Sequence, residues 1–403
     1  MASLAKTLCL WRGRMYNQDL GREPRPASDH EERSCPWKKC TTPPAISSKR
    51  SSSGREAAWN LLFEGMDTHQ GATPRSFLKL AALSPYTFNV GYANDRDIAT
   101  FSAGRLPKRA PGVDLGLPTN GTGGFEWRGY LSAAQHPQSV DPPSGQLVNW
   151  NNKPALGFAS ADDEYRYGSI FRVLMLERGI AQHKRRGKIS LAGVVGAMNQ
   201  AATQDLRDVV MLPIIKAVLD GGPPPNARDA QMLALLDQWR ARGGSRLDRN
   251  LDGLIDDPGA AIMDAVYSRW ATKLFEPTLG TALTDQLGRL LNRDSNSSCD
   301  FECGWNTYID KDLRTELGRS VRGRYSMRYC GAGDLARCRA DLWAAVDDAG
   351  NALAAVQGPD PTAWRASATA ERIKFVPGLL PITIRYTNRP SGIQQVISFA
   401  GHP

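Results

Sequence analysis

The sequence predicts a protein of the α+β class. Strand-like runs lie near both ends of its apolar part, and helix signals fill the middle. The 38 glycines and 26 prolines predict many turns between these elements. Because the first and last strands flank a helical middle, we expect them to share one sheet. An apolar content of 41% suffices for a large core, but no run reaches the roughly 18 apolar residues of a membrane span.

Residues 1–57 form a basic segment, rich in Ser and Pro, without a sustained apolar period. This composition predicts a disordered or non-native extension, and it favours a solvated tail over a nucleic-acid-binding arm. The net charge of +9 is spread over the whole chain, so we expect no nucleic-acid partner, and without an apolar run long enough for a span we expect no membrane. The first residues lack the apolar stretch of about 7–15 residues of a secretory signal, which suggests a cytoplasmic chain.

The first ordered elements are two strands, residues 86–92 and 98–102, separated by turn-forming Asn and Asp residues. This pattern predicts a β-hairpin. In residues 104–157 the density of Gly and Pro excludes helices. That region also carries aromatic residues that need apolar cover, so we expect an ordered loop region packed on a larger body. These aromatic residues are Trp127, Tyr130 and Trp150.

A helix-rich insert follows at about residues 188–356. Capping residues or a first-turn proline precede apolar residues at helical spacing, which predicts several helices. The expected helix starts are Ser190, Asn226, Pro258 and Asp334. The chain then returns to strands at residues 382–386 and 393–399, separated by a Pro- and Gly-containing turn.

Four of the seven cysteines group near the C-terminus, at Cys299, Cys303, Cys330 and Cys338. Their spacing fits two disulfides or a zinc site. Seven residues separate the second pair, against about two to four in zinc ribbons, so we favour two local disulfides. Disulfides imply an oxidising compartment, which conflicts with the missing secretory signal.

Residues 248–256 match the first nine places of a calcium loop, with oxygen-bearing side chains at alternating positions and a Gly at the sixth. The twelfth place, where a bidentate Glu belongs, is Gly259. A half-formed calcium loop and an Asx-rich turn both remain open, and we favour the turn. The five histidines are scattered singly, which disfavours a His-based metal cage or catalytic triad.

The most specific motifs are Asn120-Gly-Thr-Gly-Gly-Phe-Glu-Trp-Arg-Gly-Tyr-Leu131 and Pro142-Pro-Ser-Gly-Gln-Leu-Val-Asn-Trp-Asn-Asn-Lys-Pro154. With them the chain resembles the penicillin acylase (penicillin amidase) family of N-terminal-nucleophile hydrolases. The resemblance covers roughly residues 58–403, in the order of the later part of that family's β chain. Further matching segments are Gly104–Pro107, Asp162–Arg172, Thr203–Arg207 and Asn388–Val396.

The resemblance implies a partial αββα N-terminal-nucleophile hydrolase sandwich with a helical insertion. It also implies hydrolysis of linear acyl amides by a secreted or periplasmic enzyme. In the family, the β-chain N-terminal Ser is the nucleophile and its own α-amine, with a pKa near about 8, is the base. By resemblance, Asn151 donates to the oxyanion and Arg172 positions the active site. A structural Ca²⁺ would be held in part by the Leu115 carbonyl and by Asp162, with Asp163 as a competitor.

The chain departs from the family at the nucleophile, because no Gly-Ser-Asn-x-Trp junction occurs anywhere in it. We therefore expect it to be inactive alone and to need a complementing acylase α chain or front half. The alternative is a non-catalytic remnant or binding module. We also expect Asn151 to lie at a cleft facing residues 382–399.

Overall fold

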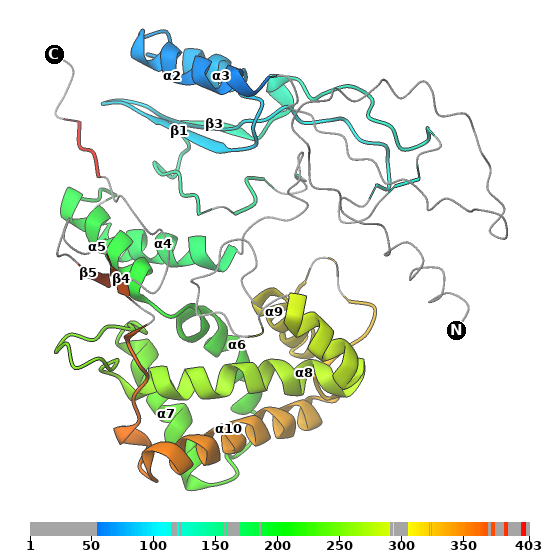
Figure 1. Ribbon diagram of the computed structural model, residues 1–403, viewed down its shortest axis with the longest axis vertical. Coiled ribbons are helices and arrows are strands. Elements are labelled where there is room, and N and C mark those ends of the chain that lie inside the picture. Colours follow the sequence, from blue (N-terminus) through cyan, green and yellow to red (C-terminus); the bar gives the residue numbers. More distant parts are fainter. Residues whose placement is uncertain are drawn as a thin grey trace.

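The computed structural model describes most of the chain from Arg55 onward. The described residues are 55–113, 119–120, 123–150, 152–155, 158, 170–184, 187–290, 293, 305–321, 323, 325–369, 372–374, 383–385 and 396–399. They form an antiparallel sheet layer with two short helices and a larger body of helices (Figure 1). The α+β prediction is therefore confirmed. The described part contains no helix long and apolar enough to cross a membrane.

The sheet layer contains β1 (Asn89–Ala93), β2 (Ile98–Ser102) and β3 (Gln138–Val140), all antiparallel, in the order β1-β2-β3. The helices α2 (Asn60–Asp67) and α3 (Pro74–Ala81) cover one face of it (Figure 1). Alternate strand residues face these helices and form a small separate core. Its members are Leu62, Phe77, Ala81, Tyr92, Ala99, Phe101 and Ala103.

The predicted hairpin is confirmed as β1 and β2, which pair from Asn89 opposite Ser102 to Ala93 opposite Ile98. Its turn is closed by Asn94, whose side-chain oxygen accepts the backbone N–H groups of Arg96 and Asp97. This is the local hydrogen bonding for which Asn is favoured in turns.

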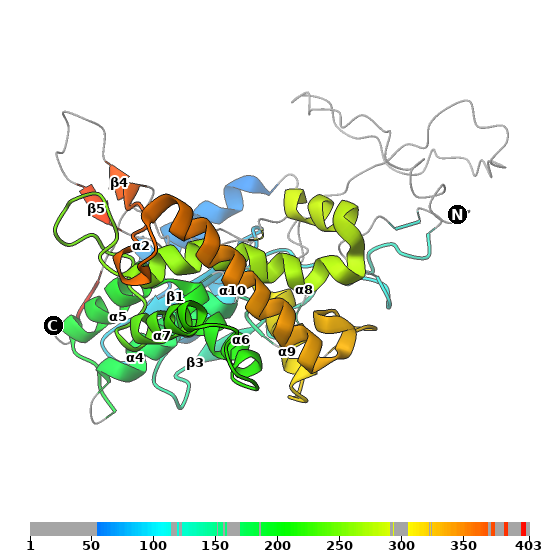
Figure 2. The same cartoon turned by 90° about the horizontal axis from the view of Figure 1, so that it is seen from below.

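The helical body consists of seven α-helices in the described part of the chain and holds the main core. They are α4 (Ile170–His183), α5 (Leu191–Thr203), α6 (Leu212–Leu219), α7 (Ala227–Ala241), α8 (Pro258–Leu290), α9 (Asn306–Glu316) and α10 (Leu335–Gln357). The helices α4 and α5 lie between the sheet layer and the other helices (Figure 1). Figure 2 shows α10 crossing the body, where it packs on α8 and Trp270 Nε1 donates to the Leu342 carbonyl at 3.1 Å.

The helix starts follow the expected capping chemistry. Ser190 and Asn226 accept N–H groups from the first turns of α5 and α7, and Pro258 opens α8. Asp334 caps α10 by accepting the N–H groups of Ala336 and Arg337. A short π-helix, residues Arg207–Met211, precedes α6 and is called the π-turn below. The helix α8 is interrupted at Gly280, which has a non-helical backbone.

The expectation of a shared sheet was wrong for the described strands. Thr383–Arg385 forms β5 and pairs with β4 (Arg372–Lys374) in a separate two-stranded sheet. A partner strand close by in sequence was available, so pairing with the distant hairpin was not needed. Residues 396–399 have no regular structure, and residues 386–395 lie outside the described part.

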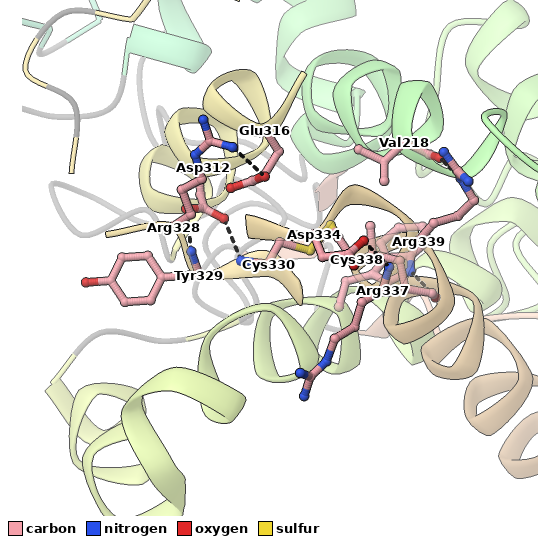
Figure 3. The surroundings of a disulfide bond; sticks show 12 residues. Val218, Asp312, Glu316, Arg328, Tyr329, Cys330, Asp334, Arg337, Cys338 and Arg339 are labelled. Carbon is pink, nitrogen blue, oxygen red and sulfur yellow. Dashed lines mark hydrogen bonds and ion pairs between the residues drawn. A yellow bond between two sulfur atoms is a disulfide. The ribbon is translucent and has the colours of Figure 1, made fainter. Parts of the chain in front are cut away.

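One predicted disulfide is present, between Cys330 and Cys338 (Figure 3). Both cysteines are fully buried. Next to them, Asp312 of α9 accepts the N–H groups of Tyr329 and Cys330 at 3.0 and 2.9 Å. Cys299 and Cys303 lie outside the described residues, so their pairing stays a prediction.

Candidate functional site

Trp150, the first residue of the Trp-Asn-Asn motif, is held against the first turn of α4 by Arg172. This side chain is buried, with 2% of the residue exposed. Its Nη2 donates to the Trp150 carbonyl at 3.3 Å, and its guanidinium carbon lies 5.3 Å from the centre of the Trp150 ring. Trp150 itself packs against the main core. Two parts of the chain that sequence reasoning singled out separately are thus in direct contact.

Asn152 fixes the other side of the motif. Its side-chain oxygen accepts the Trp150 N–H at 2.9 Å, so these two described residues of the motif are bonded to each other. Asn151 lies outside the described residues, so its distance from residues 382–399 stays untested. The described neighbours on both sides of Asn151 are nevertheless tied to each other and to α4.

A cluster of four charged side chains lies in the helical body at the π-turn, with Asp205, Arg207 and Arg246 buried and Asp264 38% exposed. Arg207 donates to Asp205 at 2.6 Å and to Asp264 at 2.5 Å. Arg246 donates to the same two carboxylates at 3.1 and 2.9 Å. Burial alone would raise the pKa of Asp264, but the two guanidinium groups hold that pKa below its usual value. This cluster joins the π-turn, the segment after α7, and α8.

The cluster is connected to α4 through the backbone of the π-turn. Arg178, six residues after Arg172 on α4, donates from Nη1 to the Val209 carbonyl at 3.0 Å. The helix α4, which carries Arg172, is therefore hydrogen-bonded to the π-turn. Sequence reasoning marked Thr203–Arg207 only through the family resemblance, since nothing in the residue pattern predicts four mutually paired charges.

The calcium-loop-like segment forms hydrogen-bonded turns. Asp248 accepts the Gly253 N–H at 3.0 Å, and Asp252 accepts the Leu254 N–H at 2.8 Å. Asp256 accepts both the backbone N–H and the guanidinium of Arg249. These contacts agree with the favoured Asx-rich turn.

The metal prediction rests on residues that the structure does not describe, namely Leu115, Asp162 and Asp163. Within the described ranges, no three His, Cys, Asp or Glu side chains are grouped so that they could hold a metal ion. A backbone carbonyl and a carboxylate are both suitable calcium ligands, but two ligands fall short of the six to eight that calcium takes.

A sequence profile of the penicillin amidase family matches residues 62–390, which is most of the chain. The chain belongs to the penicillin amidase family. Penicillin G acylase from Escherichia coli is 28% identical over 247 residues, which are 60% of this chain and 27% of that protein. The chain thus spans little more than a quarter of this curated relative.

The fold agrees with that of a solved family member. A thermostable penicillin G acylase from Alcaligenes faecalis superposes with a TM-score of 0.64 and 20% sequence identity. The superposition covers 84% of this chain and 60% of that one. At 20% identity this likeness establishes the fold alone.

Proposed function

We propose that this chain supplies part of the active site of a penicillin-amidase-type hydrolase, which cleaves linear acyl amides into a carboxylic acid and an amine. The observation that carries the proposal is the buried Arg172, held on Trp150 in the one motif that the resemblance makes catalytic. Burying a guanidinium is costly unless it is hydrogen-bonded, and Arg172 finds a hydrogen bond and a ring contact at Trp150.

In this proposal Asn151 donates its side-chain amide to the oxyanion of the tetrahedral intermediate. Such a donor contributes about 2.7–4 kcal/mol of transition-state stabilisation when it is held rigidly. Arg172 acts through the Trp150 carbonyl and is a positioning residue. The nucleophile would be an N-terminal Ser on another polypeptide or segment, with its α-amine as the base. No catalytic step is assigned to a residue of this chain beyond oxyanion binding.

The family resemblance also supports a proposal for the sheet arrangement, the calcium site and the compartment of this chain. The sheet layer would be one part of an αββα sandwich whose other strands come from the complementing acylase α chain or front half. Ca²⁺ would be bound by the Leu115 carbonyl and Asp162 together with ligands from that same partner. The Cys330–Cys338 disulfide supports maturation in an oxidising compartment, as for a secreted or periplasmic protein.

The test is hydrolysis of phenylacetyl-p-nitroanilide and penicillin G by the full chain, alone and mixed with the preceding part of the Alcaligenes faecalis acylase. We expect no turnover by the chain alone, because a covalent hydrolase without its nucleophile keeps only binding and part of an oxyanion hole. We expect turnover in the mixture, lost in Asn151→Ala and reduced in Arg172→Met.

A stable complex without turnover would favour the alternative, a non-catalytic binding module. Turnover by the chain alone that Asn151→Ala abolishes would refute the assignment of the nucleophile to another polypeptide. Arg249→Met is the matched control for Arg172→Met. It removes an Arg that is 63% exposed and bound to Asp256 in the turn segment.

A further inference from the structure

Asp208 is a buried carboxyl group at the π-turn that the charged cluster does not use. The residue is 0% exposed, and within the described ranges neither of its carboxyl oxygens has a hydrogen-bond partner. The adjacent Arg207 is turned to Asp205 and Asp264 instead. A carboxylate in such a position would be poorly solvated, whereas a neutral carboxylic acid is tolerated.

The turn after α7, residues 243–245, closes directly over this carboxyl group. Gly244 has a φ of +61°, and a Cβ atom there would lie 2.7 Å from Asp208 Oδ2 and 2.8 Å from Val209 Cγ1. Ser245 Oγ and Arg240 Nε are also buried without a hydrogen-bond partner in the described part. The turn therefore meets the π-turn through close packing, with little hydrogen bonding around the carboxyl group.

The charges that face Asp208 are predominantly negative. They come from Asp205 before the π-turn, Asp237 and Arg240 on α7, and Asp257 before α8. Arg240 already donates to Asp237 at 3.2 Å, so its charge is shared. Burial is the largest cause, followed by Asp205, and together they raise the pKa of Asp208 to about 9. The group is neutral at pH 7.

The closed 243–245 turn also stabilises the charged cluster. The Asp205 N–H donates to the Gly244 carbonyl at 2.7 Å, and the Arg246 N–H donates to the Thr203 carbonyl at 2.9 Å. Both Asp205 and Arg246 are members of that cluster. If the turn opens, these two backbone hydrogen bonds break and the Arg246 side chain loses its position in the cluster.

We propose that Asp208 is a proton-operated latch between the π-turn and the 243–245 turn. Neutral Asp208 lets the turn close over it. Ionised Asp208 faces three other carboxylates and accepts no hydrogen bond in the closed turn, so it drives the turn open and exposes the segment after α7. The latch does not rest on the proposed hydrolase function, because none of its residues is assigned to that chemistry.

The experiment is limited trypsin digestion of the full chain between pH 7 and 9.5, with products quantified by mass spectrometry. Arg242 lies directly before the turn, and its cleavage is divided by cleavage after Arg96, a 71% exposed site in the hairpin that corrects for trypsin activity. We expect this ratio to rise at least about ten-fold, because the ionised fraction of a group with a pKa near 9 rises by more than that.

Asp208→Asn should keep the ratio flat, since the amide cannot ionise. Asp220→Asn, at a 53% exposed aspartate outside the set of charges that face Asp208, is the matched control and should still show the rise. Gly244→Ala should show a high ratio already at pH 7, because its Cβ displaces the turn without any titration. A flat ratio in the unaltered chain, an equal rise in Asp208→Asn, or a closed turn in Gly244→Ala would each overturn the latch.

Discussion

Replacing both cysteines of the Cys330–Cys338 disulfide by alanine should lower the free energy of unfolding by about 2–3 kcal/mol. The bond joins residues eight apart, and the entropy of closing so short a loop in the unfolded chain gives about 2.5 kcal/mol. Both side chains are fully buried, so losing the sulfur atoms adds a small packing penalty.

The effect should stay local because other contacts hold the same segment. Asp312 still accepts the N–H groups of Tyr329 and of residue 330, and Glu316 lies 3.7 Å from Arg328 (Figure 3). Asp334 still caps α10. We therefore expect the double variant to fold, with an unchanged denaturant slope and a lower midpoint.

The measurement is guanidinium-induced unfolding followed by circular dichroism, with and without reductant. In the unaltered chain reductant should lower the midpoint by about as much as the double substitution does. In the double variant the effect of reductant reports the other cysteines and serves as the control. A double variant within about 0.5 kcal/mol of the oxidised chain would refute the loop-entropy reasoning.

Three further substitutions test the helical body. Arg207→Met should cost about 3 kcal/mol in urea unfolding, because it leaves the buried Asp205 and the partly exposed Asp264 with one cation instead of two. Gly259→Ala should cost about 1–3 kcal/mol and lower the melting temperature, since the new Cβ would lie 2.6 Å from Trp239 Cβ. Asp208→Asn should stabilise the chain by about 2–4 kcal/mol at pH 7 and by less at pH 5. Burial raises the folded-state pKa of Asp208 from 3.8 to about 9. The stability that its proton contributes is therefore complete below pH 3.8, and the free energy of unfolding falls as the pH rises from there toward 9. Equal gains at both pH values would contradict that sign.

The elements that the sequence predicted well are those decided by local chemistry. Ser190, Asn226 and Pro258 mark helix starts because a capping side chain or a fixed φ acts within one turn of its own position. The hairpin at 89–102 follows from Asn94, which closes its own turn. Neither inference needs knowledge of the rest of the chain.

The choice of partner strand was not predictable in the same way. Residues 383–385 read as a strand, but the pattern does not say which strand they pair with, and the structure gives them Arg372–Lys374. The burial of Arg172 is likewise a tertiary property, since it depends on Trp150 lying 22 residues away. Asp208 carries no sequence signal at all, because its neutral state arises from α7 and Gly244 closing over it.

The placement of the Trp-Asn-Asn motif depends on the helical body and not on the sheet layer. Trp150 packs against the main core, which is distinct from the small core under α2 and α3. Arg172 fastens Trp150 to α4, and Arg178 fastens α4 to the π-turn. The π-turn is held in turn by the buried charges of Asp205 and its partners. A chain whose sheet layer unfolds should therefore keep Trp150 in place, whereas loss of the charged cluster should disturb Trp150 through the π-turn, Arg178 and α4.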